Sequence, residues 1–189
     1  MKEIKIQIPD GKNAEWVNGV LTLVDEPKVD NRPVTERIKT FEDACNALGQ
    51  KHPFVRTYSS VSLSADTSAN GDLIAYLKLR IIAAALNEGW EPQFTEDEYR
   101  WYPWFTLWTE EELADKSEEW KKERSLWLFG GDSYYGAGCG LAYARSSHVW
   151  SLSFSYLSAR LAVKSEELAV YFGKQFIGIW ADYFGPFGK

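Results

Sequence analysis

One segment of this sequence, residues 72–88, carries an apolar pattern that fits an α-helix. Its apolar residues at helical spacing are Leu73, Leu77, Ile81 and Ala85, with Ile74, Tyr76 and Ala84 widening the stripe. Gly89 follows, and glycine is common just after the last turn of a helix. These signals predict a strong helix over residues 72–88, which is expected to pack on the sheet of the domain.

Capping signals predict further helices. Thr40 is followed by acidic residues and a short apolar face that ends at Gly49. Ser165 is the expected N-cap of a C-terminal helix over residues 165–184. Its apolar residues at four-residue steps, all expected to be buried against a sheet of residues 149–163, are Leu168, Phe172, Phe176 and Trp180. The other predicted helices cover residues 95–98 and 110–124.

Alternating and β-branched segments predict the strands, which are 4–8, 20–24, 104–108, 125–129, 141–144, 149–156 and 158–163. Residues 141–144 and 149–156 are expected to form a hairpin that turns at Arg145–His148. The Ser, Thr and Ala residues of segment 57–70 suggest a loop or an edge strand. Together these elements predict a single α+β domain over residues 1–189: an antiparallel sheet with helices packed on it and a C-terminal helix over residues 165–184.

Composition and charge exclude several classes of protein. The 189 residues are 45% hydrophobic, too many for a globally disordered chain, and no stretch approaches the ~20 apolar residues of a membrane span. The first residues lack the apolar run of a secretory signal, so a cytoplasmic protein with Cys45 and Cys139 as free thiols is expected. The net charge is −6 without a basic stripe, so neither nucleic acid nor a membrane is an expected partner.

Aromatic residues gather in one segment, with eight of them between residues 90 and 108. Large rings with a polar edge make good contact surfaces, although most rings in such a cluster are expected to pack in the core. In the predicted strand, Phe105 and Leu107 have no polar group and are expected to face inward. The indole N–H groups favour the less buried side, where Trp101, Trp104 and Trp108 are expected to form a patch. The alternative is that a neighbouring helix covers these rings through Trp120.

The glycine-rich residues 130–140 lack the Gly-Lys-Ser/Thr of a phosphate-binding loop, and a strand follows them. They therefore favour a loop between strands, at whose tip Tyr134 and Tyr135 are placed to contact a ligand. No cofactor is expected. The two histidines match no metal motif, and Cys139 with His148 lacks a third residue to orient a catalytic pair.

These observations favour a non-enzymatic binding protein whose partner is a protein or a carbohydrate. The alternative is a carbohydrate-active enzyme that uses the carboxylates near the aromatic segment, Glu96, Asp97 and Glu98. Helix starts favour acidic residues whatever the function, which gives these carboxylates an ordinary structural explanation.

Four blocks of the sequence are distinctive: residues 39–45, 89–94, 102–105 and 158–176. Together they resemble a family of uncharacterised proteins of gut anaerobic bacteria, many of them carried by prophages and other mobile elements. The resemblance implies a bacterial or phage protein of the cytoplasm and is compatible with a structural component of a virion. It implies no activity, cofactor or site residue.

Overall fold

The computed structural model describes residues 6–25, 30–64, 70–93, 98–129, 138–150 and 159–185. The chain divides into two compact units, residues 1–32 and residues 33–189. This division does not test whether residues 1–189 fold as one domain, and that expectation stays a prediction. Among the described helices, none is long and apolar enough to cross a membrane.

The first unit contains an antiparallel hairpin of β1 (Lys12–Val17) and β2 (Val20–Asp25). Asn18 and Gly19 join the strands with φ angles of 51° and 81°. Two successive residues with positive φ form the tight turn whose twist matches a hairpin, and Asn-Gly is the pair that adopts it most readily.

This turn decides which strand pairs with which. The strand predicted over residues 20–24 is confirmed. The strand predicted over residues 4–8 is wrong, because residues 6–8 form no strand and the turn brings β1 to β2 instead. Residues 4 and 5 lie outside the described part of the chain.

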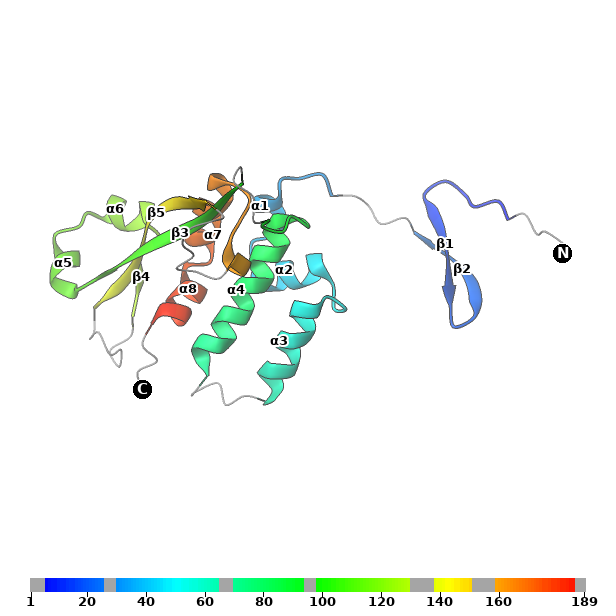
Figure 1. The fold of residues 1–189 in the computed structure, drawn as a ribbon, viewed down its shortest axis with the longest axis horizontal. Helices are drawn as coiled ribbons and strands as arrows, with labels where there is room; N and C mark the ends of the chain where they lie inside the picture. The colour runs from blue at the N-terminus through cyan, green and yellow to red at the C-terminus, as the bar shows by residue number, and fades with distance from the viewer. Residues whose placement is uncertain are drawn as a thin grey trace. The chain divides into compact units, whose positions relative to one another are not determined.

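The second unit holds the other described elements (Figure 1). Its helices are α1 (Val34–Arg37), α2 (Phe41–Leu48), α3 (Pro53–Ser64), α4 (Gly71–Asn87), α5 (Glu110–Ala114), α6 (Glu118–Glu123), α7 (Glu166–Gln175) and α8 (Ile177–Phe184). Its strands are β3 (Tyr99–Trp108), β4 (Trp127–Leu128) and β5 (Gly140–Trp150), and η1 (Ala159–Leu161) is a turn of 3₁₀-helix. The strands pair antiparallel in the order β3-β5-β4, so the predicted α+β architecture is confirmed.

Helix α4 lies at the centre of the core and packs against α2, α3 and α8 (Figure 1). The helix predicted over residues 72–88 is confirmed as Gly71–Asn87, and Glu88 is its C-cap with a left-handed φ of 50°. Contacts on several sides bury more of α4 than the predicted stripe. Leu79 and Ile82 are fully buried, whereas Leu73, a member of that stripe, is 42% exposed.

The C-terminal segment buries its four predicted residues, Leu168, Phe172, Phe176 and Trp180. Helix α7 packs on β3 and β5, while α8 packs on α4, β4 and β5. The prediction that a sheet of residues 149–163 buries this segment is therefore largely wrong, because most of the elements that pack on it lie elsewhere in the chain. Residues 151–158 lie outside the described part.

The segment is also two helices rather than one, with a break at Phe176. There the Phe172 carbonyl accepts a hydrogen bond from Trp180 Nε1 at 3.3 Å, so a side chain satisfies a carbonyl beside the break.

Two other differences from the predicted elements concern helices. Residues 53–64 form α3, not a loop or an edge strand, and burial of Val55 with contact to α4 stabilises this helix. The hydroxyls of Thr57, Ser59 and Ser64 donate to carbonyls one turn earlier, so the helix itself satisfies these polar groups. The helix predicted over residues 110–124 is divided into α5 and α6, because Ser117 accepts a hydrogen bond from Trp120 N and caps a new helix.

The predicted hairpin around Arg145–His148 is wrong, because β5 continues through these residues as one strand paired with β3. None of the four is Gly, Asn or Asp, the residues that readily adopt the positive φ of a tight hairpin turn. The strand predicted over residues 158–163 is also wrong: η1 lies there, and only Val163 pairs with Trp101. Of the strand predicted over residues 125–129, only Trp127–Leu128 forms.

Candidate functional site

The two faces of the β3–β5 pair have different surroundings. Successive side chains of a strand point to opposite faces. In β3, one face points toward α7 and α8 and includes Trp101, Pro103 and Phe105. The opposite face includes Tyr102, Trp104, Thr106 and Trp108. We call this second face, with the side chains that lie over it, the indole face.

A bulge in β5 determines which side chains of that strand reach the indole face. Trp104 pairs with Arg145 and Phe105 pairs with Tyr143, so Ala144 is an extra residue opposite this step. Tyr143 and Arg145 are two positions apart and would share a face in a regular strand. The bulge separates them: Tyr143 lies on the core side, next to Gly173 of α7, and Arg145 lies on the indole face.

Trp104 and Arg145 are both exposed on the indole face. The Trp104 side chain is 40% exposed, and the Arg145 guanidinium carbon lies 5.6 Å from the centre of its ring. A guanidinium over an indole is held by the negative charge on the ring face. The pair is therefore partly ordered before any partner arrives, while both side chains stay accessible.

Trp108 and Trp120 continue the same surface toward α5 and α6. Their rings meet edge to face, with centroids 5.2 Å apart. The Lys116 ammonium lies 4.8 Å from the centre of the Trp108 ring and 5.5 Å from that of Trp120. The Trp108 indole nitrogen is buried and has no hydrogen-bond partner in the described part of the chain.

Caps and one arginine hold this region against the sheet. Thr109 and Glu112 form a capping box at the start of α5, which orients the turn that carries Lys116. Arg124 lies 5.9 Å from the Trp120 ring and donates from Nη1 to the Ala144 carbonyl at 2.6 Å. Arg124 therefore links the helical region to the bulged residue itself.

The predicted patch of three tryptophans is only partly assembled. Trp104 and Trp108 share the indole face, but Trp101 lies on the opposite face, where its ring contacts His148 at a centroid distance of 4.7 Å. The error has a simple cause: Trp101 is an odd number of residues from Trp104, so the strand alternation separates them. Trp120 covers Trp108, as the alternative expectation had it, and leaves Trp104 exposed.

Of the two residues expected to face inward, Phe105 and Leu107, only Phe105 packs in the core. Phe105 packs on Trp180 at 5.1 Å between ring centres, as predicted. Leu107 is on the same face but is 42% exposed, so its predicted burial is wrong. It lies one residue from the end of β3, where the helices cover less of the sheet. Tyr134 and Tyr135 lie outside the described residues.

The residues considered for catalysis have structural partners or lie far apart. Glu98 accepts hydrogen bonds from Trp90 Nε1 at 3.1 Å and from the Gln93 backbone at 2.5 Å. Cys139 and His148 are separated by nearly the length of β5, about 30 Å at the usual rise, so they form no nucleophile–base pair. Glu96 and Asp97 lie outside the described part. No group of metal-ligating side chains occurs among the residues that the structure describes.

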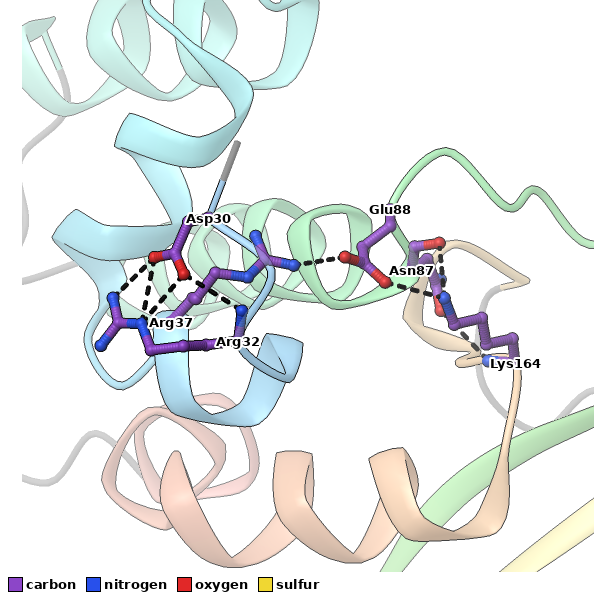
Figure 2. A network of polar contacts seen from close by, with 6 residues as sticks. All are labelled: Asp30, Arg32, Arg37, Asn87, Glu88 and Lys164. Atoms are coloured by element: carbon purple, nitrogen blue, oxygen red, sulfur yellow. Dashed lines mark hydrogen bonds and ion pairs between the residues drawn. The ribbon is translucent and has the colours of Figure 1, made fainter. Parts of the chain in front are cut away.

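A separate polar network anchors the end of α4 (Figure 2). The buried Asn87 side chain donates to the Ala162 carbonyl at 2.8 Å and accepts from the Lys164 backbone at 3.1 Å. Glu88 pairs with Lys164 at 3.1 Å and with Arg37. The hydrogen bond from Lys164, supported by that from Arg37, holds the pKa of Glu88 below its usual range. The network joins α1, α4 and the segment before α7, which is a structural role.

Comparison of the chain with family models, curated proteins and solved structures gave no match. The arrangement of residues is therefore the basis for the functional argument.

Proposed function

We propose that this chain is a binding protein that contacts a partner protein through the indole face. The observation that carries the proposal is the exposed Trp104 ring with the Arg145 guanidinium beside it on a hydrogen-bonded sheet. Tryptophan and arginine are the residues most often found to dominate the binding energy of protein interfaces. A rigid strand and a ring already held by a cation reduce the entropy that binding has to remove.

Trp104 belongs to a larger contact surface and is not an isolated exposed ring. Trp108, Trp120 and Lys116 continue the face beside it, and Thr106 of the same strand is exposed. Single exposed apolar residues are normal on any protein, whereas a run of rings and cations on one face marks an interaction site.

A selection experiment tests the proposal without knowledge of the partner. A random peptide library is selected on the immobilised protein, and the affinities of the recovered peptides are measured for the wild type, Trp104→Ala and Trp127→Ala. Trp127 is 45% exposed and pairs with Leu141, which places it on the core side of the sheet, so it is a matched control. We expect Trp104→Ala to weaken binding at least about tenfold and Trp127→Ala to leave it unchanged. If the recovered peptides bind Trp104→Ala as tightly as the wild type, the indole face is not the binding surface.

We also propose that the protein acts in the cytoplasm and is of prophage or mobile-element type. The support is the sequence resemblance of residues 39–45, 89–94, 102–105 and 158–176. The carbohydrate-active alternative stays a prediction.

A further inference from the structure

We infer that the indole face takes an acidic peptide segment in which carboxylates stand beside apolar side chains. The inference rests on the proposed function and adds the chemistry of the partner. Its first support is the composition of the two strands: neither β3 nor β5 contains an Asp or a Glu, and Arg145 is exposed on the indole face. Arg100 is buried, and His148 lies beside Trp101 on the opposite face. The chain as a whole has 27 acidic and 21 basic residues, so a sheet without carboxylates differs from the rest of the molecule.

The cations of this face provide the second support. Lys116, Arg124 and Arg145 each lie over an indole ring. In the ion pairs of the described residues, acidic side chains pair with other cations: Arg32, Arg37, Lys121 and Lys164. Arg124 uses its guanidinium on the carbonyls of residues 143 and 144. Arg145 is exposed at the surface of this face, where its N–H groups can meet a carboxylate from outside.

The geometry of Arg145 and Trp104 indicates what sits next to that carboxylate. A guanidinium offers two parallel N–H donors that match the two oxygens of a carboxylate. The Trp104 indole beside the guanidinium offers an apolar surface on which an apolar side chain can pack. A peptide side chain that is acidic and a neighbour that is apolar would use both groups together.

The neighbouring helices argue against a uniformly charged polymer such as a nucleic acid. The first turns of α5 and α6 carry exposed carboxylates: Glu110, Glu111, Glu118 and Glu119. A chain of phosphates that followed the face past Arg145 would meet these charges, and nucleic-acid binding needs several cations in a row. A peptide can place one or two carboxylates at Arg145 and apolar residues elsewhere.

Fluorescence anisotropy with labelled synthetic peptides tests the inference. The probe is a short peptide in which Glu alternates with Leu and Phe, and its matched analogues carry Gln or Lys in place of Glu. A single-stranded oligothymidylate of similar length is the nucleic-acid arm. The proteins are the wild type, Trp104→Ala, Arg145→Gln, Arg145→Lys and Arg56→Gln. Arg56 is exposed on α3, away from the sheet, and is the matched control. Circular dichroism and thermal melts confirm that each variant is folded.

We expect the Glu peptide to bind wild-type protein at least about tenfold more tightly than the Gln peptide. Arg145→Gln should remove that difference, Arg145→Lys should keep part of it, and Arg56→Gln should leave it intact. Added salt should weaken the Glu peptide and spare the Gln peptide.

Three results would overturn the inference, and they separate it from the proposed function. If the Gln or Lys peptide binds as tightly as the Glu peptide and Trp104→Ala weakens it, the face binds peptides without preferring acidic ones. If the oligothymidylate binds more tightly than the Glu peptide, or if no peptide of the set binds, the partner is not an acidic peptide. If the Glu peptide binds equally to wild type, Arg145→Gln and Trp104→Ala, the indole face is not involved, and the proposed function fails with the inference.

Discussion

Gly173 is the position where two opposing effects of one substitution can be weighed from the structure. It lies buried in the last turn of α7, against β3 and β5. A Cβ built on Gly173 would lie 2.7 Å from Pro103 Cβ and 2.8 Å from Tyr143 Cδ2. Both distances are far below ordinary van der Waals contact, about 3.5–4.0 Å between carbon atoms. The substitution Gly173→Ala therefore forces α7 and the sheet apart.

Helix propensity works in the opposite direction. Alanine stabilises a helix interior by about 1 kcal/mol relative to glycine. An extra methyl group in a filled core costs about 1–3 kcal/mol, because neighbours leave their preferred positions. Neither neighbour moves easily: the Pro103 ring belongs to the strand backbone, and the Tyr143 hydroxyl is hydrogen-bonded to Ser146 at 2.8 Å. The steric cost should be near its upper end, which leaves a net loss of about 1–2 kcal/mol.

Gly178 of α8 provides the matched control. The three atoms nearest to a Cβ there would be outer atoms of the Trp127 ring, at 3.0–3.4 Å. Trp127 is 45% exposed and has room to shift. Gly178→Ala should therefore keep most of the propensity gain and leave stability unchanged or raised by up to about 1 kcal/mol.

Urea unfolding followed by far-UV circular dichroism measures both variants against the wild type. We expect Gly173→Ala to lower the midpoint with an unchanged m-value and Gly178→Ala to keep or raise it. A Gly173→Ala protein as stable as Gly178→Ala would refute the close packing of α7 on Pro103 and Tyr143.

Further predictions concern a core ring, an ion pair and the thiols. Phe176→Ala should cost about 3–5 kcal/mol in urea unfolding, because its ring is buried among core side chains, and a loss under about 1 kcal/mol would show that the break between α7 and α8 is peripheral. The pKa of Glu88 is lowered on folding, so its contribution is present above its unfolded pKa of about 4.3 and is lost as the pH falls through the lower folded value. The stability difference between wild type and Glu88→Gln should shrink across that acid window, and a difference independent of pH would contradict the pairing with Lys164. Neither Cys45 nor Cys139 forms a disulfide, so mass analysis of the unfolded, unreduced protein after alkylation should find two modified thiols, and an internal disulfide would contradict the structure.

The elements that could be predicted from sequence are those whose signals are local. Helix α2 begins where Thr40 caps it, with Thr40 Oγ1 accepting from Asp43 N at 3.1 Å, and both residues are visible in the sequence. The Asp43 carboxylate accepts in return from the backbone of Lys39 and Thr40, which lowers its pKa. The spacing of apolar residues likewise gave α4 within a residue at each end. In each case the hydrogen bonds that define the element join residues within one turn.

The elements that could not be predicted depend on contacts made over long distances in sequence. Leu73 belongs to the apolar stripe of α4 but is 42% exposed, whereas Leu77 and Ile81 of the same stripe are buried by the elements packed on α4. The serine-rich α3 has little apolar periodicity, so its sequence gives no clear helix signal. Burial of Val55 and contact with α4 stabilise this helix instead. The local amino-acid composition of these segments does not indicate which other helices pack on them.

The side chains of β5 that lie on the indole face also could not be predicted from the sequence. A period of two through β5 places Tyr143 and Arg145 together, yet they lie on opposite faces because Ala144 is inserted between their pairing partners. The extra carbonyl of Ala144 needs a donor, and it receives one from Arg124, 20 residues earlier in the chain. The same Arg124 lies over Trp120, whose ring covers Trp108. Arg124 thus contacts both the bulge that brings Arg145 to Trp104 and the ring that covers Trp108, so the exposed pair and its half-buried neighbour belong to a single packing arrangement.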